Sequence, residues 1–201
     1  IDSANSWCVL KNIEQIPAYR DLLLTLLGEL EDVTKGTTGE MLRPEGFIFV
    51  SSPGSMTPYH FDPEHNILLQ LRGWKTMTVF PAGDPRFAAP EAHEAYHSGG
   101  GPRNLPWDDA FALHGTDYRL EPGQAIFVPV MSPHYVRNGD RPSISLSITW
   151  RSEWSYAETD AHAMNSVLRR FGLNPSPPRR YPVNNAFKSL GYRVLRKLGL
   201  D

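Results

Sequence analysis

Apolar and polar residues alternate in short runs through the middle of the chain, a pattern typical of β-strands rather than helices. Glycine and proline separate the runs, and Asn138-Gly139 predicts a turn between the last two. Such closely spaced strands favour an antiparallel sheet. In chain order the runs are WCVLK (7–11), GFIFVSS (46–52), HNILLQLRG (65–73), KTMTVFP (75–81), EPGQAIFVPV (121–130) and RPSISLSITW (141–150).

Helical periodicity appears on both sides of these strands. Pro17 begins the leucine-rich stretch PAYRDLLLTLLGEL, which predicts a packing helix before a loop marked by Gly36 and Gly39. A second helix is predicted to end at Gly172. The last stretch, NAFKSLGYRVLRKLGL, predicts an amphipathic helix with basic residues opposite its apolar face. That apolar face consists of Phe187, Leu190, Val194 and Leu198.

These elements predict a mainly β fold, a small barrel or sandwich with helices at both ends. We expect a single domain over residues 1–201, with a core barrel at about 46–150 and a helical extension at about 151–201. The segment from Ala82 to about Leu113 is rich in Pro, Gly, Ala and His. It is predicted to be a long insertion across an opening of the barrel.

Composition narrows the range of partners. The formal net charge is only −2 over 201 residues, so no global field favours nucleic acid or an anionic membrane. The lone cysteine, Cys8, excludes an internal disulfide, and we expect it to pack in the core. No apolar run approaches the roughly 18 residues of a membrane span, and no signal-peptide pattern opens the sequence. We therefore expect a cytoplasmic protein without a membrane span.

The stretch TPYHFDPEHNILLQLRGWK (57–75) places charged groups inside an apolar segment. Burying such groups is costly unless a metal or a counter-ion compensates. Residues two apart on a strand face the same side, so His60 and Asp62 are expected to face the barrel interior together. His134 can supply a third ligand from a neighbouring element. Two histidines and one carboxylate form the facial triad of non-haem Fe(II) oxygenases, which leaves three coordination positions open.

Three further residues are predicted to reach the same pocket. Thr57 offers a hydroxyl and Lys75 an ammonium group, which together suit a distal carboxylate. Asn66 points to the same place. In KTMTVF the alternation puts Lys75 on the same face as Met77.

On these residues the chain resembles the JmjC-type, cupin-fold 2-oxoglutarate oxygenases, particularly the small protein hydroxylases typified by the asparaginyl hydroxylase of hypoxia-inducible factor. The resemblance covers roughly residues 46–150. It is carried by TPYHFDPEHN, LRGWK, the run PVMSPH that ends at His134, and SITW, which ends at Trp150. The chain departs from the typifying hydroxylase at Ile148, where that enzyme has an asparagine in contact with the cosubstrate.

The resemblance implies a cupin/JmjC double-stranded β-helix. It also implies that Fe(II) binds His60, Asp62 and His134, while Thr57 and Lys75 hold the far carboxylate of 2-oxoglutarate and Asn66 lies near the cosubstrate. The implied reaction consumes O2, releases succinate and CO2, and hydroxylates a C–H bond of a protein, peptide or small molecule. An apolar lining would protect this chemistry from water. The expected lining is one face of a strand, with the Ser/Thr face outward: Ile144, Leu146, Ile148 and Trp150.

Two alternative functions remain open. A non-oxygenase metal-binding cupin, either an isomerase or lyase or a binding module, would keep the metal ligands without needing Lys75. The motif HEAYH (93–97) also matches the His-Glu-x-x-His of zinc peptidases. The window between Pro90 and SGGGP (98–102) leaves little more than two helical turns, so we expect His93 and His97 to be exposed residues of the insertion. Since C-terminal helices mediate dimerisation in several members of the resembled family, the last helix also suggests a homodimer.

Overall fold

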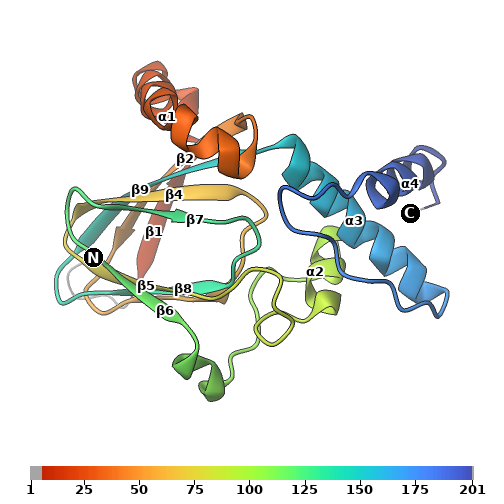
Figure 1. Ribbon diagram of the computed structural model, residues 1–201. Coiled ribbons are helices and arrows are strands. Elements are labelled where there is room, and N and C mark those ends of the chain that lie inside the picture. The colour runs from red at the N-terminus through yellow and green to blue at the C-terminus, as the bar shows by residue number, and fades with distance from the viewer. Residues whose placement is uncertain (1–5, 201) are drawn as a thin grey trace.

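The computed structural model describes residues 6–200, and within them two antiparallel sheets face each other (Figure 1). The larger sheet has the strand order β1-β2-β9-β4-β7 and the smaller one β3-β8-β5-β6. The larger sheet contains β1 (Trp7–Lys11), β2 (Leu42–Ser51), β9 (Ser143–Arg151), β4 (His65–Arg72) and β7 (Ala125–Val128). The smaller contains β3 (Met56–His60), β8 (His134–Asn138), β5 (Lys75–Val79) and β6 (Thr116–Leu120).

Helices cover one outer face and one end of this barrel. The helix α1 (Pro17–Thr38) lies over the larger sheet, whereas α2 (Pro90–His97), α3 (Glu153–Arg170) and α4 (Ala186–Lys197) gather at one end (Figure 1). Two short 3-10 helices, Ile13–Gln15 and Asp109–Leu113, complete the regular structure of the described residues. The predicted β-barrel with helices in the N-terminal and C-terminal parts of the chain is confirmed. Among these helices none is long and apolar enough to cross a bilayer.

The first helix is longer than predicted. It starts with Pro17 in its first turn, but it continues through Gly36 and ends only at Gly39, whose φ of 80° suits glycine. Expecting a loop at Gly36 was therefore wrong. An exposed glycine costs a helix only about 1 kcal/mol, and burial of Leu23 and Leu27 against the larger sheet offsets that cost.

The two faces of β9 are inverted relative to our expectation. Leu146, Ile148 and Trp150 pack with Leu23 and Leu27 of α1, so the apolar face points out of the barrel. Ile144 shares this face because strand residues alternate. The predicted apolar pocket lining is thus wrong, since alternation shows that the faces differ but not which one a helix will cover. Ile148, the position at which the chain departs from the typifying hydroxylase, therefore points away from the barrel interior.

The serine face of β9 points into the barrel. Ser145 donates a hydrogen bond to Gln70 Oε1 at 2.9 Å, and Ser147 donates to Asn66 Oδ1 at 2.7 Å. An apolar cluster from both sheets fills another part of the interior: Leu68, Met77, Leu120, Val128 and Val136. This cluster shows that the faces of β5 and β8 carrying Met77 and Val136 point inward.

The remaining elements lie in the segment 82–113 and in the C-terminal part of the chain. The insertion contains α2 and a 3-10 helix, and β6 follows it; neither α2 nor β6 was predicted as an element. Ser152 caps α3 through a hydrogen bond from the Ser155 amide, and the helix ends just before Gly172, as predicted. Cys8 is exposed on β1, so its predicted core packing is wrong.

Candidate metal centre

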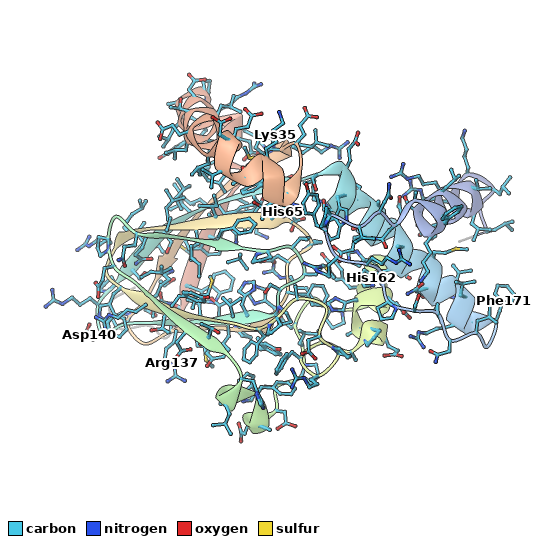
Figure 2. All side chains as sticks on the ribbon, viewed as in Figure 1. Lys35, His65, Arg137, Asp140, His162 and Phe171 are labelled. Carbon is cyan, nitrogen blue, oxygen red and sulfur yellow. The ribbon has the colours of Figure 1, made fainter. Side chains whose placement is uncertain are left out.

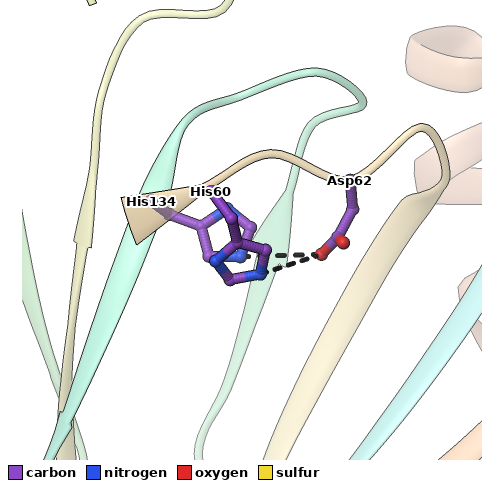
Figure 3. A group of neighbouring side chains, drawn as sticks. All are labelled: His60, Asp62 and His134. Atoms are coloured by element: carbon purple, nitrogen blue, oxygen red, sulfur yellow. Dashed lines mark ion pairs between the residues drawn. The ribbon is translucent and has the colours of Figure 1, made fainter. Parts of the chain in front are cut away.

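Three side chains meet where β3 ends and β8 begins (Figure 3). His60 is the last residue of β3 and pairs with His134, the first residue of β8. Asp62 lies two residues beyond β3, in the connection to β4, rather than on a strand as expected. Asp62 Oδ2 is 3.7 Å from His60 Nε2 and 3.6 Å from His134 Nε2. Within residues 6–200 this is the one group of three or more His, Cys, Asp or Glu whose potential ligand atoms lie within 4.8 Å of one another.

Backbone carbonyls orient both imidazoles. His60 Nδ1 lies 2.8 Å from the Pro58 carbonyl oxygen, and His134 Nδ1 lies 2.9 Å from that of Ser132. Donating Nδ1–H to these carbonyls leaves each Nε2 with a lone pair towards Asp62. The Met131 amide also donates to the Asp62 carbonyl at 2.8 Å, which ties the Asp62 backbone to the loop before His134.

The protonation states suit a divalent cation. Burial would raise the pKa of Asp62, but its interactions with His60, His134 and Arg103 outweigh burial and hold that pKa well below its usual range. Burial lowers the pKa of His134 to about 4, so its imidazole is neutral at pH 7. The donor set of one carboxylate and two imidazoles fits Fe(II), and also Mn, Co, Ni or Zn.

Lys75 is a buried cation without a counter-ion. Its residue is 4% exposed, and no hydrogen bond or ion pair joins its ammonium group to any other described residue. Burial lowers its pKa to about 8, so it is still mostly charged at neutral pH. Lys75 pairs with Asn138, four residues along β8 from His134. At about 3.3 Å per residue the two levels are about 13 Å apart along the strand.

Thr57 and Asn66 face the same interior from two other strands. Thr57 on β3 pairs with Val136, so it lies between the levels of His134 and Lys75. Asn66 on β4 is buried in the larger sheet, and its side-chain oxygen Oδ1 accepts a hydrogen bond from the Ser147 hydroxyl. No hydrogen bond joins its amide NH2 to an acceptor among the described residues. The roles assigned to these residues remain predictions, although both side chains lie on strand faces that point into the barrel.

Two charged neighbours of the centre were not anticipated. Arg103 Nη1 lies 2.7 Å from Asp62 Oδ1, although it comes from the insertion, where no spacing links it to Asp62. Glu64 follows Asp62 in the same connection, and burial together with the charge of Asp62 raises its pKa to about 7. Both line the edge of the site, with Arg103 exposed and Glu64 partly so.

The HEAYH histidines belong to a structural contact instead. They lie on α2, where His93 is 3% exposed and packs on Phe61 and on His162. His162 belongs to α3 and is labelled in Figure 2. His97 is partly buried and stacks on His162, so the expectation that both are exposed is wrong. The insertion folds back as a helix against α3, which removes these side chains from water. In the described chain they do not form a converging ligand group, so the zinc peptidase alternative lacks a site.

The barrel and this site define the class of protein. Residues 25–156 match the family model described as a cupin-like domain, and the chain belongs to that family. The predicted cupin fold is thereby confirmed.

Particular relatives narrow the comparison. The chain is 32% identical over 105 residues to the lysine-specific demethylase JMJ30 of Arabidopsis thaliana, covering 50% of this chain and 24% of that protein. It is 30% identical over 108 residues to Jumonji C domain-containing protein 5 of Drosophila melanogaster, covering 48% and 25%. It therefore spans about a quarter of the length of these relatives. The ribosomal oxygenase YcfD of Escherichia coli shares the fold, with a TM-score of 0.50, 17% identity, and coverage of 94% of this chain and 46% of that one.

Proposed function

We propose that this protein is an Fe(II)- and 2-oxoglutarate-dependent oxygenase that hydroxylates a C–H bond of a protein, a peptide or a small molecule. The observation that carries the proposal is Lys75, a residue that is only 4% exposed and whose ammonium group has no acceptor among the described residues. Keeping such a charge buried costs stability. A bound dicarboxylate would supply the missing counter-ion, whereas an isomerase, a lyase or a simple metal-binding module has no need of it.

In this proposal, different residues of the barrel bind the metal and the cosubstrate. His60, Asp62 and His134 would hold the metal, a set of two imidazoles and one carboxylate that suits Fe(II). Lys75 and Thr57 bind the far carboxylate of 2-oxoglutarate. When bound, Fe(II), 2-oxoglutarate and O2 supply the oxidation, with release of succinate and CO2.

Aromatic packing fixes the metal-binding strand from behind. Tyr59 and Phe61 flank His60 in sequence and point to the opposite face, into a core cluster with Phe80 and Phe87. The Tyr59 hydroxyl donates to the Phe87 carbonyl at 2.9 Å. Because these large side chains are buried, the His60 backbone is held in place and water is excluded from that side of the centre.

Protein and peptide substrates receive support from the relatives. One of them carries the name of a lysine-specific demethylase. Hydroxylation of an N-methyl group releases that group, so demethylation and stable hydroxylation are two outcomes of the same C–H chemistry. The insertion that contacts the centre is the segment we expect to select between substrates.

An anaerobic titration tests the proposal. Adding 2-oxoglutarate to the Fe(II)-loaded protein should produce a weak visible metal-to-ligand absorption band, because the cosubstrate chelates the metal. Lys75→Ala should require much more 2-oxoglutarate to reach the same band. Metal binding without any such band would favour the non-oxygenase cupin, and an unchanged titration in Lys75→Ala would contradict the role of Lys75.

A further inference from the structure

The insertion adds a short paired segment to the metal-binding strand. The Leu105 amide donates to the Tyr59 carbonyl at 2.9 Å, and the Phe61 amide donates to the Arg103 carbonyl at 3.3 Å. His60 forms an isolated antiparallel bridge with Asn104 between these two bonds. Residues 103–105 are thus fixed directly beside a predicted metal ligand, although they follow the strand by more than forty positions in the chain.

The two oxygens of the Asp62 carboxylate have different partners. Oδ2 faces the imidazoles of His60 and His134 at 3.7 and 3.6 Å, whereas Oδ1 lies 2.7 Å from Arg103 Nη1. A charge-assisted hydrogen bond of this length is short and directional. It prevents the carboxylate from turning about its Cβ–Cγ bond, a torsion that is otherwise soft.

We propose that Arg103 is a positioning residue of the metal centre: it holds Asp62 as a one-oxygen donor and thereby couples the insertion to metal binding. The inference rests on the metal centre of the proposed function. It goes further by assigning the insertion a part in metal binding, because the group that orients the ligand is delivered by this segment rather than by the barrel.

Two opposing effects make the sign of a substitution informative. If Arg103 acts by orientation, its removal frees the carboxylate and weakens metal binding, as loss of an outer partner of a metal ligand commonly does by about 10- to 100-fold. If its positive charge simply repels the cation, removal should strengthen binding. The arginine side chain is 50% exposed, so its replacement opens no cavity in the core.

Co(II) titration of the purified protein, followed by calorimetry and by visible absorption, tests this inference without turnover. We expect Arg103→Leu and Arg103→Gln to bind Co(II) about 10- to 100-fold more weakly. Arg103→Lys keeps one charged donor and should retain most of the affinity. Arg86→Leu is the matched control, because Arg86 is an exposed arginine of the same insertion that pairs with Asp84 instead. Unchanged or tighter binding in both Arg103→Leu and Arg103→Gln would overturn the proposal.

Amide hydrogen exchange tests the coupling separately. In the wild type, Co(II) should slow exchange at the Leu105 amide, because a ligand fixed by the metal also fixes Arg103. In Arg103→Leu, a saturating concentration of Co(II) should slow exchange at the Leu105 amide only slightly. Equal protection in both proteins would refute the coupling. If the wild type bound no Co(II), or if Asp62→Ala bound Co(II) as tightly as the wild type, the proposed metal centre itself would be wrong. Failure of the proposed function can thus be distinguished from failure of this inference.

Discussion

Replacing Lys75 with methionine should make the protein more stable and less able to bind 2-oxoglutarate. Methionine has a similar length and no charge, so it fits the barrel interior without the desolvation cost. Burial lowers the pKa of Lys75 from 10.5 to about 8, which corresponds to a cost of about 3 kcal/mol for keeping the charged form. We therefore expect Lys75→Met to raise the free energy of unfolding by about 2–3 kcal/mol at pH 7.

The sign of the pH dependence follows from the direction of that shift. Because the folded-state pKa lies below the unfolded value, the wild type carries the full penalty below about pH 8 and loses it as pH rises towards 10.5. The stability advantage of Lys75→Met should therefore shrink over this window. Urea denaturation at pH 7 and pH 10 measures it, and Lys11→Met on the exposed strand β1 is the control.

The same substitution should cost 2-oxoglutarate affinity. A hydrogen bond to a charged group contributes about 1.5–3 kcal/mol, so the dissociation constant should rise by about 10- to 100-fold. Calorimetry with the Co(II)-loaded protein measures this without turnover. A variant that is less stable than the wild type, or that binds 2-oxoglutarate equally well, would refute the view of Lys75 as a cation kept for a ligand.

Three further predictions concern other parts of the molecule. Asp62→Ala should abolish succinate formation with an unchanged circular dichroism spectrum, and turnover at the wild-type rate would exclude Asp62 as a required ligand. Burial lowers the pKa values of His93, His97 and His162, the first two to about 4 and about 3, so all three are neutral in the fold. The free energy of unfolding should therefore fall as pH drops from about 6.5 towards 4. Equal urea midpoints at pH 7.5 and 5 would contradict this. Phe187 on α4 is 97% exposed, and we expect the apolar face of this helix to form a homodimer. Phe187→Asp should then sediment as a monomer. A monomeric wild type would show the expectation wrong.

Elements with a clear apolar period were predictable from the sequence, and elements without one were not. The patterns located β2, β4, β5 and β9, together with the helices α1, α3 and α4. The strand β6 was missed because the alternation of Tyr118 and Leu120 with Asp117 and Arg119 covers too few positions, and four of its five residues are exposed. The helix α2 is only eight residues long and lies between a proline and a glycine run, which makes it resemble a loop.

The candidate site was predictable as far as local spacing and family resemblance reach. His60 and Asp62 are two residues apart, and the structure brings His134 to them through the pairing of β3 with β8. Arg103 was not predictable, because its approach to Asp62 depends on how the insertion folds back along β3. Contacts of this kind arise from tertiary structure, and no pattern of residue types encodes them locally.

The inverted faces of β9 show how the fold can keep a polar interior. Most apolar burial occurs outside the barrel, where α1 covers Leu146, Ile148 and Trp150, and behind β3, where aromatic side chains pack. The interior can therefore carry fully buried Gln70 and a row of serines, each satisfied by a neighbour across the sheet. Because stability is supplied elsewhere, the barrel can tolerate one unsatisfied charge at Lys75. A cavity made under α1 should accordingly lower stability while leaving the geometry of the metal centre unchanged.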